Sequence, residues 1–274
     1  MADEPTPVAD LPVLRIAHLW PALLNVAGDG GNVSAVELRS KWRGIRTEIV
    51  GYEAGDPVPD LASFDIVFVQ GGQDVEMRLV ALDLPRVAGA LREAADAGVV
   101  MLPVCAGLQL LGHRYIPNTG ETLEGAHVLD LETRGGNQRF MQHAACEVTI
   151  DGETSTVVGF ENHSGVTELG PGVIPFGRVV AGAGNNGVDG TEGAQRDNVF
   201  ATYLHGPVLP KNPWLADVLV RRALSRKTGA PVVLASLDDA VEQHNHEVAL
   251  GKAMRNKGQR TALEPAKLSR AEKG

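Results

Sequence analysis

The first half of the chain alternates short apolar runs with segments of helical character, and this alternation limits the fold more than any other feature. Runs suited to buried strands lie at Val13–Leu19, Thr47–Gly51, Asp65–Gln70 and Gly98–Leu102. Helices are predicted between and after these runs at Asn32–Gly44, at Val75–Ala97 in two pieces broken near Pro85, and at Ala106–Arg114. Strands that alternate with helices in this way predict an α/β fold with a mostly parallel central sheet and helices on both faces.

The second half of the chain is richer in strands. Candidate strands, separated by glycine, asparagine and aspartate turns, lie at Glu147–Ile150, Thr156–Gly159, Gly177–Ala181 and Val199–Leu204. Two more helices are predicted at Pro213–Lys227, where proline suits the first turn, and at Leu237–Met254. Because we find no internal repeat and no break in composition, we expect one domain with extra antiparallel strands in its second half.

The two ends of the chain differ in composition from the predicted domain. Residues 1–10 are acidic and contain proline, and we expect them to be flexible. The segment Lys252–Gly274 carries seven Lys or Arg and two Glu, on a protein of net charge −9. We interpret residues 11–258 as the domain and residues 259–274 as a basic, solvated and flexible tail. A docking arm for an acidic partner surface is the alternative interpretation of the tail.

Composition argues against several classes of function. The negative net charge and an aromatic content of only 4% disfavour nucleic-acid binding. No run approaches the roughly 18 apolar residues of a membrane span, and the acidic N-terminus is unlike a signal peptide. We therefore expect a cytoplasmic protein without direct membrane insertion. Two cysteines cannot supply a four-thiolate zinc site, and no histidine has an acidic neighbour at metal-ligand spacing, so no metal is predicted.

Cys105 occupies the most informative position in the sequence. It stands where the predicted buried strand ending at Leu102 runs into a helix, and the small residues Ala106 and Gly107 follow it. This is the pattern of a nucleophile elbow, with cysteine in place of serine. Unpaired N–H groups and the positive end of the helix dipole favour the thiolate, and the N–H of Ala106 is placed to stabilise an oxyanion. The other cysteine, Cys146, starts an apparent strand and is interpreted as a buried structural residue.

A thiolate nucleophile needs a general base, and histidine is the preferred choice. His205 follows the apolar run Val199–Leu204 and precedes Gly206-Pro207. If this run and the strand before Cys105 are parallel neighbours, both side chains lie at the carboxyl edge of the sheet, where catalytic groups collect. His163, in the segment Gly159–Gly165, is the alternative base.

At these residues the sequence resembles a known family. The segment Cys105-Ala106-Gly107-Leu108-Gln109-Leu110-Leu111-Gly112 is similar to the elbow of class I glutamine amidotransferases, especially the cobyric acid synthase-like group. The segments Gly159–His163 and Thr202–Pro213 narrow the resemblance to the GatD family, the glutaminase subunits of bacterial lipid II isoglutaminyl synthases. The resemblance covers about Leu14 to Lys227 and implies the three-layer α/β fold of these amidotransferases.

The resemblance implies a role for each matching residue. Cys105 would be the nucleophile and His205 its general base and acid. The backbone N–H of Gly72 would join that of Ala106 in binding the oxyanion. Gln109 would help to hold the substrate, L-glutamine. Arg139 would bind the α-carboxylate of glutamine, a role that suits a planar guanidinium with two parallel donors.

The sequence departs from larger class I enzymes in one important respect. Those enzymes carry a glutamate two residues after the catalytic histidine, and this chain has Pro207 there. The cobyric acid synthase-like group also tends to lack that acid, so we expect a Cys–His dyad, and the group that orients His205 is left unassigned. Proline also replaces the frequent elbow glycine at Pro103, where its fixed φ suits an extended approach.

The resemblance also implies a partner. The chain contains no GxxxxGK[ST] phosphate loop and is predicted to need no cofactor of its own. A Mur-ligase-like synthetase subunit (MurT) would form a heterodimer with it and use ATP and Mg²⁺. That subunit would amidate D-glutamate in the stem peptide of lipid II, so this chain would contact lipid II only through its partner. A cobyrinate-type amidotransferase subunit or another Cys–His hydrolase, and a non-catalytic docking module of the same fold, are the alternatives.

Overall fold

A computed structural model of the protein describes residues 13–25 and 28–271, with side chains described up to residue 257. A six-stranded sheet forms the centre, in the order β11-β12-β4-β3-β1-β2. The parallel strands are β1 (Leu14–Leu19), β2 (Thr47–Tyr52), β3 (Ile66–Val69), β4 (Val100–Pro103) and β12 (Val199–Ala201). The edge strand β11 (Ala194–Arg196) runs antiparallel to β12.

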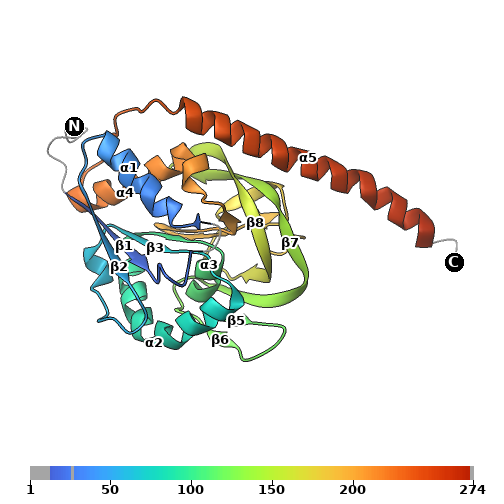
Figure 1. The fold of residues 1–274 in the computed structure, drawn as a ribbon, viewed down its shortest axis with the longest axis horizontal. Helices are drawn as coiled ribbons and strands as arrows, with labels where there is room; N and C mark the ends of the chain where they lie inside the picture. The colour runs from blue at the N-terminus through green and yellow to red at the C-terminus, as the bar shows by residue number, and fades with distance from the viewer. Residues whose placement is uncertain (1–12, 26–27, 272–274) are drawn as a thin grey trace.

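Helices cover both faces of this sheet (Figure 1). They are α1 (Gly31–Trp42) and α4 (Pro213–Thr228) on one face, and α2 (Asp74–Asp96) with the short α3 (Ala106–Leu111) on the other. Every residue of β3 and β4 is buried, because a parallel sheet covered on both sides leaves neither face to solvent. The predicted α/β fold with a mostly parallel sheet is confirmed.

A second, largely antiparallel sheet is built around a long hairpin of β7 (Leu131–Ile150) and β8 (Glu153–Leu169). The hairpin turns at Asp151-Gly152, where both residues have positive φ, as a tight two-residue turn requires. The predicted strands Glu147–Ile150 and Thr156–Gly159 are the paired ends of this hairpin. The other strands of the sheet are β5 (Arg114–Ile116), β6 (Leu123–Glu124), β9 (Gly177–Ala181), β10 (Thr191–Glu192) and β13 (Leu204–His205).

Three expectations about individual elements were wrong. The helix α2 continues through Pro85 without a break, because its buried face, which includes Leu84 and Val87, packs on the core and outweighs the hydrogen bond that proline cannot make. The helix after Cys105 ends at Leu111, so the predicted C-terminal residue of that helix already belongs to β5.

The third wrong expectation concerns the predicted strand Val199–Leu204, which is two strands in two different sheets. The chain leaves β12 after Ala201, and Leu204 pairs in β13 with the second sheet. The crossing is held by the buried Glu192, whose carboxylate accepts hydrogen bonds from the Thr202 hydroxyl at 2.9 Å and the Tyr203 N–H at 2.7 Å. His205 therefore lies where the two sheets meet.

The last helix, α5 (Ala240–Ala271), is longer than the predicted Leu237–Met254 and extends away from the body of the protein (Figure 1). Ala249 and Ala253 pack it on the second sheet. The chain leading into it is anchored by Arg39, which pairs with Asp217 at 2.7 Å and Asp239 at 2.6 Å.

The helical backbone of α5 covers most of residues 259–274, and the flexibility of that tail and the domain limits stay predictions. Residues 1–10, which we expect to be flexible, lie outside the described residues. Within the part of the chain that the structure describes, no helix combines the length and apolar character needed to cross a bilayer.

The short 3-10 turns η3 (Leu61–Ser63) and η4 (Leu209–Lys211) lie in the connections between these elements. The second of these follows His205 and is tied to α1, because the N–H of Leu209 donates to the side-chain oxygen of Asn32 at 2.8 Å. Asn32 in turn donates to Gln70, just after β3. The segments that follow β1, β3 and β12 are therefore linked by buried hydrogen bonds at one edge of the central sheet.

Candidate active site

Cys105 forms the corner between β4 and α3, as the sequence predicts. Its φ of 49° lies in the left-handed region, which residues with a side chain rarely adopt. The N–H of Cys105 donates to the carbonyl of Thr202 at 2.8 Å, which ties the corner to the chain after β12. Gly107 lets α3 approach β3 closely, since a Cβ there would collide with the carbonyl oxygen of Val69. Strain held in place by the surrounding structure is typical of functional sites.

His205 reaches the same edge of the central sheet. The predicted parallel arrangement is confirmed, because Val199 pairs with Met101 and Thr202 with Val104, which brings the two chain segments side by side. Only 2% of His205 is exposed. Burial of its imidazole opposes a positive charge, but the neighbouring Cys105 and Asp29 outweigh burial and raise the pKa of His205 to about 10. The arrangement favours the imidazolium form of His205 beside the sulfur of Cys105.

Asp29 is the group that orients His205. Its side-chain Oδ2 lies 2.7 Å from Nδ1 of His205, and Asp29 is fully buried. The same carboxylate accepts the N–H of Gly71 at 3.3 Å and that of Gly206 at 3.4 Å. Gly71 has to be glycine, because a Cβ there would collide with both His205 and Asp29. With Nδ1 donating to the carboxylate, Nε2 is left to exchange a proton with a substrate or with Cys105.

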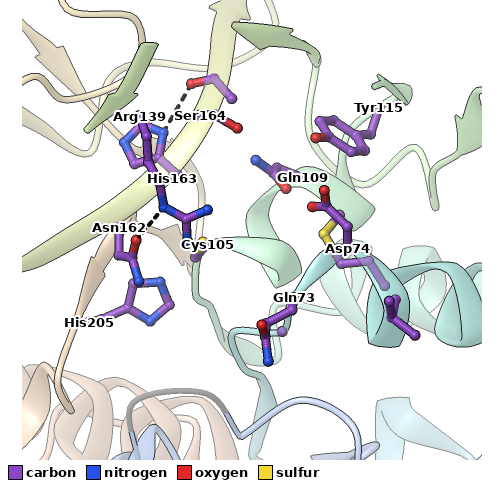
Figure 2. Close-up of a pocket in the computed structure, with 14 residues that line it drawn as sticks. Gln73, Asp74, Cys105, Gln109, Tyr115, Arg139, Asn162, His163, Ser164 and His205 are labelled. Atoms are coloured by element: carbon purple, nitrogen blue, oxygen red, sulfur yellow. Dashed lines mark hydrogen bonds between the residues drawn. The ribbon is translucent and has the colours of Figure 1, made fainter. Parts of the chain in front are cut away.

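Cys105 and His205 line a cavity of about 470 Å³ between the two sheets and the start of α2. Gly72, Gln109 and Arg139 line it as well, so five of the six residues singled out in the sequence meet in one space. Figure 2 shows Arg139 entering from the β7–β8 side and Gln109 from α3. Ala106, the sixth residue, is the first residue of α3 and is buried next to Cys105.

Arg139 is aimed by an irregularity in β7. The register of the β7–β8 pairing shifts between Gly135 and Phe140, and Arg139 lies in this stretch. Such bulges redirect side chains beside active sites. The Nε of Arg139 donates to the side-chain oxygen of Asn162 at 2.9 Å (Figure 2). Its two terminal nitrogens make no hydrogen bond with any residue that the structure describes, which leaves a planar fork to bind a carboxylate.

The N–H groups of Gly72 and Ala106 are the candidate oxyanion donors. Neither group donates a hydrogen bond to any described part of the chain. Gly72 packs tightly, because a Cβ there would lie 2.5 Å from the Leu24 side chain. The Ala106 N–H is the first of α3, where the amide has no intrahelical acceptor. An oxygen bound by both groups would be held beside the sulfur of Cys105.

Comparison with known proteins identifies the family of this chain. Residues 15–213 match the CobB/CobQ-like glutamine amidotransferase domain. The chain belongs to this family. The resemblance inferred from the motifs is thereby confirmed, and with it the prediction that the chain is a glutamine amidotransferase.

Individual relatives cover most of this amidotransferase. It is 36% identical over 248 residues to the GatD subunit of the glutamine-hydrolysing lipid II isoglutaminyl synthase of Staphylococcus aureus, covering 90% of this chain and 99% of that protein. The GatD subunit of the same kind of synthase from Streptococcus pneumoniae is 36% identical over 233 residues, covering 84% of this chain and 88% of that protein. A crystal structure of a glutamine amidotransferase shares the fold with a TM-score of 0.51 at 18% identity, covering 76% of this chain and 98% of that one.

The surroundings of His163 and Cys146 differ from those of His205 and Cys105 in this amidotransferase, and they disfavour His163 as the base and Cys146 as the nucleophile. His163 also lines the cavity, but it stacks on Tyr203 and bonds through Nδ1 to the carbonyl of Gly165 at 3.0 Å. Burial lowers the pKa of His163 to about 4, so its imidazole is neutral at pH 7. Cys146 is fully buried next to Glu192, and burial raises the pKa of its thiol well above the usual range, as expected for a structural cysteine.

Sequence reasoning missed two acidic residues of the site, Asp29 and Asp74. Asp29 lies in the glycine-rich segment Gly28-Asp29-Gly30-Gly31, just before the predicted helix, and no motif marks it as part of a site. The signal that could have found it is its position in the connection between β1 and α1, which begins at the same edge of the sheet as the carboxyl end of β4. Asp74 begins α2 and lines the cavity, and no spacing in the sequence relates it to Cys105.

Proposed function

We propose that this chain is the glutaminase subunit of a lipid II isoglutaminyl synthase. It hydrolyses L-glutamine and supplies ammonia to a Mur-ligase-like, ATP-dependent synthetase subunit (MurT), which amidates D-glutamate of the lipid II stem peptide to D-isoglutamine. The observation that carries the proposal is the strained Cys105 beside the buried His205–Asp29 pair, in a cavity that also holds Arg139. Two GatD subunits of lipid II isoglutaminyl synthases, each similar to most of this chain, support the assignment to this synthase.

In the first half of the reaction, the Cys105 thiolate attacks the side-chain amide carbon of glutamine. The N–H groups of Gly72 and Ala106 stabilise the oxyanion, and the loss of one such donor typically costs about 2.7–4 kcal/mol. His205, already protonated, donates its Nε2 proton to the leaving nitrogen as the C–N bond breaks. Ammonia departs and a γ-glutamyl thioester stays on the sulfur.

In the second half, the now neutral His205 takes a proton from water, and the resulting hydroxide attacks the thioester. Glutamate is released and the thiolate–imidazolium pair is restored. Asp29 accepts the Nδ1–H of His205 throughout, so the imidazole keeps one tautomer and one orientation. The expected Cys–His dyad is thus extended by an acid from the turn after β1, and not by one that follows the histidine.

The remaining cavity residues bind the substrate. Arg139, fixed by Asn162, binds the α-carboxylate with its two terminal nitrogens. Gln109 donates from Nε2 to the Tyr203 hydroxyl at 3.1 Å, which holds its amide in one orientation and leaves its carbonyl oxygen for the substrate amide. We expect no cofactor to take part in this half-reaction, since ATP and Mg²⁺ would be used by the partner subunit.

The test is ammonia release from L-glutamine by the full chain co-purified with its synthetase subunit. Cys105→Ala and His205→Ala are each expected to abolish release, and Cys146→Ala, which removes the other thiol, to retain it. Iodoacetamide should alkylate Cys105 faster than Cys146 near pH 7, as mass spectrometry of the peptides would show. Turnover that survives Cys105→Ala would exclude the proposed nucleophile. Purification without any ATP-dependent subunit would count against the proposed partner.

A further inference from the structure

The cavity contains one carboxylate and one arginine, and they lie on opposite walls. Among its described lining residues, Asp74 is the only acid and Arg139 the only Lys or Arg. Figure 2 shows Asp74 at the start of α2, with its carboxylate beside Gln109, and Arg139 on the side of β7 and β8, with its guanidinium beside Cys105; both residues line the same cavity. This arrangement presents a negative and a positive group to a molecule bound at the sulfur.

Neither charge is satisfied within the protein. The carboxylate of Asp74 makes no hydrogen bond or ion pair with any residue that the structure describes, and neither do the terminal nitrogens of Arg139. Burial of Tyr115 and the nearby charges of Asp74 and Cys105 raise the pKa of the Tyr115 hydroxyl, so the charge of Asp74 acts on the wall of the cavity that Tyr115 lines. Two unpaired opposite charges facing one cavity suit a ligand that carries both signs.

A free α-amino acid is such a ligand. Its carboxylate and ammonium are attached to one carbon, so a guanidinium and a carboxylate that face each other across a cavity bind both groups at once. We propose that Asp74 accepts hydrogen bonds from the α-ammonium of glutamine, opposite the α-carboxylate held by Arg139. This inference rests on the proposed function, and it makes Asp74 a residue that selects a free amino acid over an amide without the ammonium.

Two other features have to be separated from this role. Asp74 is in the first turn of α2, where any acid interacts favourably with the helix dipole, but that effect stabilises the fold and does not discriminate between substrates. The carbonyl oxygen of Gln109 is a second acceptor in the cavity, but it is neutral. A charged acceptor makes a stronger hydrogen bond to an ammonium, so the larger share of the selectivity falls to Asp74.

The experiment compares L-glutamine with glutaramate, which is glutamine without the α-amino group. Steady-state kinetics of ammonia release are measured for the complex of this chain with its synthetase subunit. Asp74→Asn is expected to lower kcat/KM for L-glutamine by about 10- to 100-fold, mainly through KM, because one charge-assisted hydrogen bond is lost. For glutaramate, kcat/KM should stay within about twofold of the unmodified complex, since no ammonium is present to lose a partner.

The matched control is Glu93→Gln, which removes one negative charge from the exposed face at the other end of α2. This variant should leave kcat/KM unchanged for both substrates. A second readout, protection of Cys105 from iodoacetamide by each compound, reports binding without turnover. Equal losses on both substrates, or no loss on L-glutamine, would overturn the role of Asp74 while the proposed function stands. If the unmodified complex releases no ammonia from L-glutamine, the proposed function itself fails.

Discussion

Replacing Asp29 by asparagine tests how the buried acid contributes to the reaction. The carboxylate lies 2.7 Å from His205 Nδ1 and is fully buried, so no water replaces it. The rise in the pKa of His205 from 6.5 to about 10 corresponds to about 5 kcal/mol in favour of the imidazolium, shared between Cys105 and Asp29. A hydrogen bond to a charged group contributes about 1.5–3 kcal/mol of this.

The loss of that hydrogen bond alone predicts a decrease of about 10- to 150-fold in kcat/KM for L-glutamine. Asparagine has a further effect, because its amide can donate to Nδ1 and fix the proton on Nε2, the wrong tautomer for accepting a proton. We therefore expect a decrease of about 10²- to 10⁴-fold. The Cys105 alkylation rate at pH 7 should fall as well, since a less stable imidazolium supports less thiolate.

The assay is ammonia release by the complex, together with the pH dependence of Cys105 alkylation. Asp130→Asn is the matched control, because Asp130 pairs with His113 at 2.9 Å in a partly exposed Asp–His pair outside the cavity. That variant should keep the activity of the unmodified protein. If Asp29→Asn retains kcat/KM within about threefold and an unchanged alkylation profile, the orienting role of Asp29 is refuted.

Further predictions concern stability. Gly107→Ala should destabilise the protein by about 3 kcal/mol and abolish activity, because its Cβ would collide with the carbonyl of Val69. The control Gly89→Ala, in an exposed part of α2 with open space around it, should stabilise by about 0.5–1 kcal/mol. Urea unfolding of both variants decides between these outcomes, and equal effects would contradict the packing argument. The stability contributed by the His205 imidazolium should be complete below pH 6.5 and lost as the pH rises to about 10. The urea midpoint should fall over that range, and a fall of the same size in His205→Asn would contradict this assignment.

Much of the parallel sheet was predictable from the sequence. The strands β1, β3 and β4 are almost entirely apolar because helices cover both faces of the sheet. Such runs of apolar residues can be recognised in the sequence alone. The corner at Cys105 was predictable for a local reason, since a strand, a cysteine and two small residues leave little choice of geometry. Pro85 shows the limit of local rules, because packing of α2 on the core outweighed the tendency of proline to break a helix.

The sequence by itself determined the family and singled out Cys105 and His205 as candidate nucleophile and base, because each of these inferences depends on residues close together in the chain. Only the tertiary structure decided which acid orients His205, since Asp29 is 176 positions away and meets it through strand order in the sheet. The same holds for the position of Asp74 opposite Arg139, because the two residues face each other only after α2 and the β7 bulge pack around one cavity. Spacing along a chain constrains local geometry, whereas contacts between distant segments depend on how the sheets and helices pack.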